Sequence, residues 1–231
     1  MILRKILLLL GTVFFICDSS AQTSNMFNIH FAPTFGVRQI DLSDSAFAVN
    51  ENSKFAIEVL KFYVSDFRFL NKGKEVGREK NSYHLVDASI KSTLDFKISA
   101  PLQKEFDQLV FNLGIDSATN VSGVLGGDLD PTKGMYWTWQ SGYINFKLEG
   151  TSNLCKTRNN EFQFHLGGYQ YPYSSIQEVS LLTKNDKSIT IKLDIEKAMS
   201  GIDLSTQDHI MSPKSEAVVL SNKFSKAFTI E

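Results

Sequence analysis

Four histidines, scattered singly along the chain, are the residues best suited to bind a metal: His30, His84, His165 and His209. Neutral imidazole is a good ligand for copper or zinc. None of the four has the close pairwise spacing of a zinc finger, so a shared site must be assembled by the fold. His30 and His165 alternate with apolar residues, which predicts that they lie on the non-core face of their strands. For either one alone, a surface histidine is the simpler interpretation.

Both tryptophans of the chain lie in the short run MYWTW that begins at Met135. Trp137 and Trp139 are alternate residues, so they share one face of a strand and either cover a core edge or line a ligand or metal site. Met135 would add a soft thioether to a copper site. Together with Tyr136 and Tyr143, the two indoles could instead form an aromatic platform for a glycan or a protein partner.

Other candidate groups give weaker signals. Asp128 and Asp130 lie beside a Gly-rich loop and could bind calcium, but the EF-hand pattern is incomplete and turn capping is the commoner role of such residues. Cys155 has no histidine near it in sequence to activate it as a nucleophile. A hydrolase would need converging carboxylates, and Asp128, Asp130 and Glu149 show no telling arrangement. Because motifs for nucleophilic, phosphate-binding and dinucleotide-binding sites are absent from the sequence, it favours a binding protein over an enzyme.

The N-terminus has the features of a secretory signal peptide, predicted over residues 1–21. Arg4 and Lys5 precede a short apolar run and a small-residue cleavage site. That run is shorter than the ~20 residues of a membrane span, and no later segment approaches this length. We expect an exported protein of the periplasm, cell surface or medium. Removal of the signal peptide would take away Cys17 and leave Cys155 as the single cysteine, and hence no internal disulfide.

Composition and periodicity predict one β-rich domain over residues 22–231. The formal net charge of −1 lacks the basic footprint of a nucleic-acid-binding protein. From Phe55 to Phe69, apolar residues alternate with other residues, but the alternation shifts by one residue within the run. Such shifts are typical of β-bulges, although a helix or a strand buried on both faces would also fit. Shorter alternating runs occur at residues 27–31, 83–87, 94–98, 109–115, 143–149, 162–166, 179–181 and 189–195.

Only the C-terminal tail changes period. Ser212 is a good N-cap residue, Pro213 suits the first helical position, and apolar residues then recur at helical spacing. We therefore predict the all-β class: an antiparallel β-sandwich with elaborated loops and one C-terminal α-helix.

Four ordered segments resemble the methanobactin-partner-protein-like (MbnP-like) family: LKFYVSDFRFL (60–70), FNLGID (111–116), LDPTKGMYWTWQSGYINFKLEG (129–150) and FHLGGY (164–169). The resemblance spans nearly all of the predicted mature chain. It implies a β-rich, secreted bacterial copper-binding protein. In the family, Cu(I) is bound by histidines and by a tryptophan that a partner di-haem protein of the MauG type has oxidised to kynurenine.

Mapped onto this chain, the resemblance implies that Trp137 or Trp139 is the modifiable indole, that His165 is the best copper ligand and that His30 is the second. The WTWQSGY segment contains no histidine, so the family's close spacing between tryptophan and histidine is missing. Kynurenine would offer an aniline nitrogen, which with two imidazoles suits Cu(I). The chain would then sequester or deliver copper and be the substrate of its partner. This hypothesis requires the indoles and imidazoles to meet beneath one loop.

Overall fold

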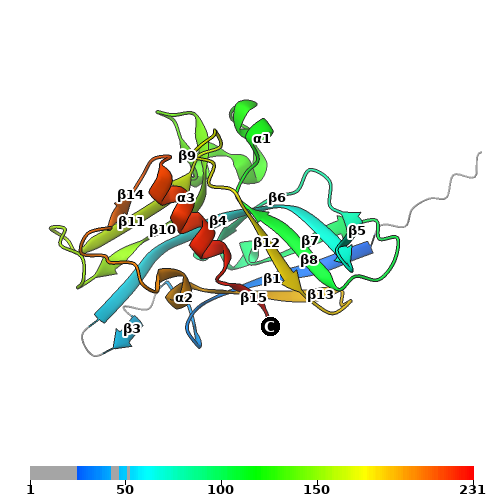
Figure 1. The fold of residues 1–231 in the computed structure, drawn as a ribbon, viewed down its shortest axis with the longest axis horizontal. Coiled ribbons are helices and arrows are strands. Elements are labelled where there is room, and N and C mark those ends of the chain that lie inside the picture. The colour runs from blue at the N-terminus through cyan, green and yellow to red at the C-terminus, as the bar shows by residue number, and fades with distance from the viewer. Residues whose placement is uncertain (1–24, 43–46, 51–52) are drawn as a thin grey trace, which may run out of the picture.

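Two β-sheets packed face to face form the body of the protein (Figure 1). The computed structural model describes residues 25–42, 47–50 and 53–231, so the predicted signal peptide at residues 1–21 lies outside the described residues. Within the described part of the chain, no helix is long and apolar enough to cross a membrane.

The smaller sheet has five strands among the described residues. Its order is β15 (Phe228–Ile230), β13 (Ser188–Asp194), β1 (Asn25–Phe35) and β2 (Arg38–Gln39), and β7 (Asp95–Ala100) also pairs with β1. β1 and β13 are parallel and the other pairs are antiparallel.

The larger sheet has ten strands, counted over the same described residues. Its order is β12 (Gln177–Leu182), β8 (Gln108–Leu113), β4 (Ser53–Asn71), β10 (Gly142–Ser152), β11 (Glu161–Gly167) and β14 (His209–Ile210). Four short strands extend it: β3 (Phe47–Asn50), β5 (Lys74–Arg78) and β6 (Tyr83–Asp87) pair with β4, and β9 (Tyr136–Trp137) pairs with β10. The predicted sandwich is confirmed, although β1–β13 and β11–β14 are parallel pairs that we did not expect.

Strand β4 accounts for the phase slips seen in the sequence. It runs for 19 residues and shifts register against β8 between Ser65 and Arg68, where Asp66 adopts a φ of 55°. Phe62 belongs to the core between the sheets, whereas Tyr63 belongs to a cluster on the other face. The strand is therefore both bulged and buried on two faces.

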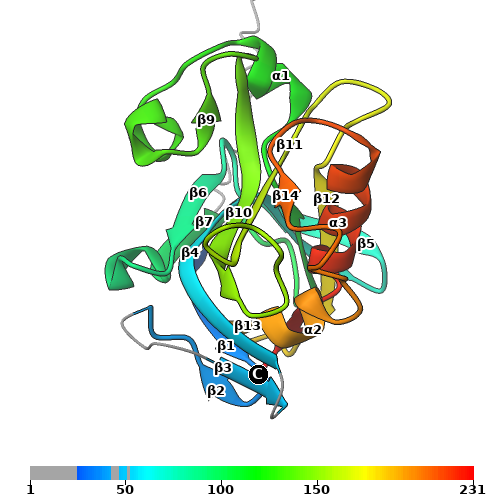
Figure 2. The same ribbon diagram turned by 90° about the vertical axis from the view of Figure 1, so that its left-hand side faces the viewer.

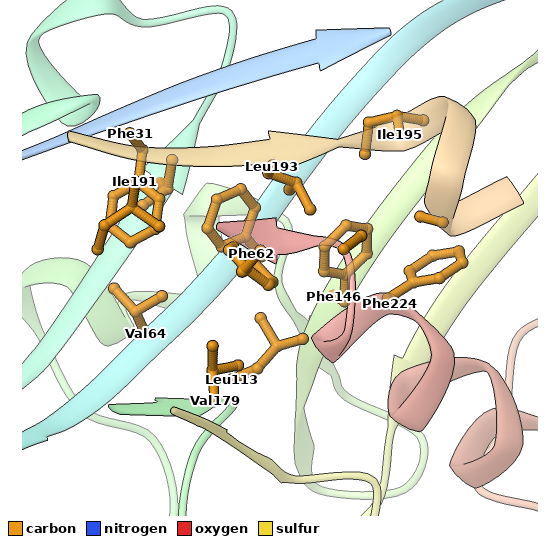
Figure 3. Close-up of a cluster of buried hydrophobic side chains, with 14 of the residues drawn as sticks. Phe31, Phe62, Val64, Leu113, Phe146, Val179, Ile191, Leu193, Ile195 and Phe224 are labelled. Carbon is orange, nitrogen blue, oxygen red and sulfur yellow. The ribbon is translucent and has the colours of Figure 1, made fainter. Parts of the chain in front are cut away.

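The main core lies between the two sheets and is rich in phenylalanine (Figure 3). Ring centroids are 5.5 Å apart for Phe31 and Phe62, 5.5 Å for Phe62 and Phe146, and 4.9 Å for Phe146 and Phe224. Phe224 comes from the C-terminal helix α3 (Ser215–Ser225), whose apolar side packs on this core. Such aromatic pairs add about 0.5–1.5 kcal/mol each to the stabilisation from burial.

A second, smaller hydrophobic cluster covers the face of the large sheet that is turned away from the small sheet. We call this the outer face, and its cluster the outer cluster: Tyr63, Leu85, Ile115, Leu129, Met135, Trp137, Tyr143 and Ile144. Half of it is supplied by the long excursion between β8 and β10, which Figure 2 shows rising beyond the end of the sandwich. The excursion contains α1 (Ser117–Val121), η2 (Gly127–Leu129) and η3 (Pro131–Lys133).

The helices differ from the prediction in three ways. Residues 117–127 are small and polar, which is typical of a flexible connection, but they begin with α1, which Asp116 caps by accepting a hydrogen bond from the Thr119 amide at 2.9 Å. The tail helix begins at Ser215 rather than at Pro213, and the chain after it enters β15. The short helix α2 (Ile195–Met199) was not predicted, and η1 (Lys91–Thr93) is a single turn.

Asn145 joins the excursion to the loop after β11. Its side chain is buried, accepts a hydrogen bond from the Ile115 amide at 2.9 Å and donates one to Ser175 Oγ at 2.8 Å. We expect Asn145→Ala to lower the free energy of unfolding by about 1–3 kcal/mol, because a buried amide would lose its acceptor. Urea unfolding measures this, with the exposed Asn222→Ala as the matched control; equal midpoints for the two variants would contradict it.

Candidate functional site

The two tryptophans lie in different environments although they are alternate residues. Trp137 is 6% exposed and its ring packs on Gly167 of β11, where an added Cβ would lie 2.6 Å from Trp137 Cζ3. Trp139 is 65% exposed, with its ring centroid 5.8 Å from that of Trp137. Strand β9 ends at Trp137, so the alternation that would place both indoles on one face ends there too.

Met135 and Tyr143 are packing residues of the outer cluster. Met135 is fully buried, and Tyr143 is buried with its hydroxyl 3.1 Å from the carbonyl oxygen of Leu129, to which it donates. Tyr136 is partly buried, with its ring centroid 5.0 Å from that of Tyr143. The platform of four exposed rings is therefore not formed, and the Met135 thioether has no solvent exposure.

His165 lies on the outer face in β11, between the core residues Phe164 and Leu166. Its Nε2 is 2.5 Å from Glu149 Oε1, and Lys147 Nζ is 3.2 Å from the same oxygen. Burial lowers the pKa of His165 below its ordinary value of 6.5, so the ring is neutral at pH 7. Burial alone would raise the pKa of Glu149, but the hydrogen bonds that its carboxylate accepts from His165 and Lys147 lower that pKa below its ordinary value. Because an ionised carboxylate only accepts, Nε2 carries the proton and Nδ1 keeps its lone pair.

His209 is the histidine that the fold brings to His165. β14 runs parallel to β11, with His209 opposite Gln163 and Ile210 opposite Phe164. Phe164 and Ile210 both belong to the main core, so His209 shares the outer face with His165. After burial, which is the main cause, an electrostatic contribution from His209 also lowers the pKa of His165. His209 Nδ1 is 2.9 Å from Asp208 Oδ1, which leaves Nε2 open.

The expected meeting of His30 with His165 is wrong. His30 lies in β1 of the small sheet between the core residues Ile29 and Phe31, so it faces away from the core on the opposite side of the sandwich. Its Nδ1 is 2.7 Å from Asp95 Oδ1 on β7. Strand pairing, which alternation alone does not specify, decides which histidines become neighbours.

The remaining sequence candidates have structural roles. Asp130 caps η3 by accepting from the Thr132 amide at 2.8 Å, and Asp128 Oδ1 is 2.8 Å from Lys133 Nζ. The first contact supports turn capping by Asp130, and the second shows that Asp128 forms an ion pair. Burial raises the pKa of the Cys155 thiol to about 11, so it is a poor nucleophile. Among the described residues, no group of three or more His, Cys, Asp or Glu side chains is arranged to hold a metal.

A cleft of about 260 Å³ opens beside Trp137, between the β9–β10 hairpin and the loop that follows β11. Tyr169, Tyr173 and Pro213 line it together with Trp137. In the sequence, residues 169–173 follow Gly167 and Gly168 and are typical of a turn. Their density of aromatic rings was the one signal that could have marked a site.

Protonation of His165 should make stability depend on pH. The folded pKa is below the unfolded one, so the unfolded state binds more protons and the free energy of unfolding falls as pH drops below 6.5. We expect the free energy of unfolding of His165→Gln to change less between pH 7.5 and 5.5 than that of the native protein. The Glu149 carboxyl, whose pKa is lowered, stays ionised throughout this interval. Urea unfolding at the two pH values measures the slope. An unchanged slope in the variant would show that His165 is not its source.

Comparison with known proteins identifies relatives of this fold. The solved structure of MbnP from Methylosinus trichosporium has a TM-score of 0.61 over 85% of this chain and 87% of that one, at 16% sequence identity. At that identity the likeness shows a shared fold. No curated protein matches the sequence. The sequence profile of the MbnP family matches residues 24–213, most of the chain, and the chain therefore belongs to the MbnP family.

Proposed function

We propose that the protein is an exported copper-binding protein that holds Cu(I) on the outer face of the large sheet and sequesters or delivers it. The observation that carries this proposal is the placement of His165 and His209 on adjacent strands of that face. Each ring has one nitrogen hydrogen-bonded to a carboxylate and the other free to bind a metal. Membership of a family associated with copper and methanobactin supports the choice of metal.

The available ligands, imidazole nitrogens and a thioether sulfur, fit Cu(I) better than a metal ion that prefers oxygen ligands or needs four ligands. Two neutral imidazoles suffice for a low-coordinate cuprous ion, and Met211, which is exposed and follows β14, adds a soft sulfur. Glu149 and Asp208 would hold the rings in position, as carboxylates do behind metal-binding histidines. His209 and Met211 thus take the places that the sequence suggested for His30 and Met135.

The proposal is tested by anaerobic titration of the mature chain with Cu(I) against a chromophoric chelator. We expect uptake of one equivalent at pH 7.5 with a Kd tighter than about 1 µM. Affinity should fall at pH 5, where protons compete for the imidazoles. Failure to take copper from the chelator at any ratio, with protein isolated from its own host, would refute the proposal.

Within this proposal, Trp139 is the indole open to oxidation. It is 65% exposed, whereas Trp137 is 6% exposed, so a MauG-type di-haem partner would reach only Trp139. Conversion to kynurenine removes one carbon and adds one oxygen. We expect intact-mass analysis of host-purified protein to show this change, and the change to vanish in Trp139→Phe. Its persistence in that variant, or an unmodified native mass, would contradict the assignment.

A further inference from the structure

We propose that the cleft beside Trp137 binds one ring of a neutral saccharide, at a site separate from the proposed copper ligands. The cleft lies between the β9–β10 hairpin and residues 168–173, and Pro213 closes one side. None of the four histidines lines it. Its volume of about 260 Å³ is just below the ~300–1,000 Å³ of clefts for drug-sized molecules, which suits a single ring.

The character of the lining excludes ionic recognition. None of the ten described residues around the cleft carries a charge. A phosphate, sulfate, carboxylate or metal ion would lose its hydration there without gaining a counter-charge. A neutral ligand that is partly apolar and partly hydrogen-bonding avoids this cost.

The side chains present match the two kinds of surface on a sugar ring. Tyr169 and Tyr173 offer aromatic surface, against which the C–H face of a pyranose packs, and the nearly buried Trp137 borders the cleft. Gln140 and Gln170 offer amides that both donate and accept, as ring hydroxyls require. Tyr171 is 97% exposed, so its ring is free to pack against a bound ligand.

The cleft is already organised without a ligand. The Tyr173 amide donates to the Gln170 carbonyl at 2.8 Å, and the Ser175 amide donates to the Gly168 carbonyl at 3.0 Å. Ser117 Oγ donates to the Tyr169 carbonyl at 2.9 Å, which ties the loop to α1. A rigid wall reduces the entropy lost on binding, so even a small ligand can be held.

A proline-rich peptide is the main alternative occupant, because such peptides also dock on aromatic-lined grooves. These ligands are extended helices that need a long groove rather than a space for one ring. The compact volume and the paired amides therefore favour a saccharide.

The test uses the mature chain with Trp139→Phe, so that Trp137 is its only indole and its fluorescence reports on the cleft. The probes are neutral hexasaccharides (cellohexaose, mannohexaose, xylohexaose, laminarihexaose and chitohexaose), polygalacturonate as a charged saccharide, and a proline-rich peptide. We expect a saturable change with at least one neutral saccharide and none with polygalacturonate. Binding of the peptide alone, or no response to any neutral saccharide, would overturn the proposal.

Two exposed positions then test the geometry. In the same background, Gln170→Ala and Tyr173→Ala should each weaken saccharide binding about tenfold or more. Leu182→Ala, also exposed but on β12, is the matched control and should leave binding unchanged. Cu(I) uptake should be unaffected by the two cleft variants, so failure of this proposal is distinguishable from failure of the copper proposal. Unaltered saccharide affinity in both cleft variants would place the ligand elsewhere.

Discussion

His165→Ala is expected to weaken Cu(I) binding by more than about 100-fold, because even loss of a carboxylate behind a metal ligand typically costs about 10–100-fold in affinity. The substitution leaves Glu149 with Lys147 as a partner at 3.2 Å, so the side chain left behind is not an isolated charge. His165 also lies off the main core, and the fold should persist. Competition titration with a Cu(I) chelator, alongside circular dichroism, measures both effects.

The chain supplies a matched control for this experiment. His30 is also a strand histidine with one nitrogen on a carboxylate, but it lies on the small sheet. His30→Ala should therefore leave Cu(I) affinity unchanged, while His209→Ala should resemble His165→Ala. Loss of copper binding in His30→Ala, or its retention in His165→Ala, would place the site elsewhere.

Gly150→Ala should lower the free energy of unfolding by about 3 kcal/mol, the upper part of the usual range for overpacking. Gly150 lies in β10 where the register against β4 shifts after Glu149. An added Cβ would be 2.0 Å from the carbonyl oxygen of Ala56 and 2.8 Å from Phe162 Cζ. The Ala56 oxygen is backbone within the sheet, so it cannot move aside without breaking strand pairing. Urea unfolding gives the change directly.

Gly126→Ala is the control for this prediction. Gly126 has a φ of −95°, and an added Cβ would meet no atom within 4 Å, so alanine fits without strain. Its effect should stay within about 0.5 kcal/mol. If the two variants unfold at the same urea concentration, the close approach of β10 to β4 at Gly150 does not limit stability.

Much of the fold could be predicted because strand alternation is a local property. Residues 83–87 were predicted as a strand and form β6, and the clean alternation from Ile189 forms β13. The phase slips after Phe55 left a bulged strand, a helix and a strand buried on both faces open, and β4 is a strand that is both bulged and buried on two faces. The prediction failed where no long periodic run marks the structure: it missed the five-residue helices α1 and α2, and it began α3 at Pro213, whereas Lys214 is the N-cap.

The candidate site shows the limit of this reasoning more clearly. Alternation correctly placed His165 on the non-core face, because successive side chains of a strand point to opposite faces whichever strands pair with it. It did not reveal His209, because β14 has only two residues and its pairing with β11 spans a long connection. Alternation also did not reveal that Trp137 is buried and Trp139 exposed, because the burial of Trp137 depends on how the excursion folds over the outer face.

The amino-acid sequence by itself determined the β-rich class and the faces of the strands, because these follow from local periodicity and composition. Only the tertiary structure decided that His165 meets His209 rather than His30, that Met135 is buried, and that an uncharged cleft opens beside Trp137. The physical reason is that a strand's pattern specifies which way its side chains point, whereas the neighbours they meet depend on long-range pairing of segments.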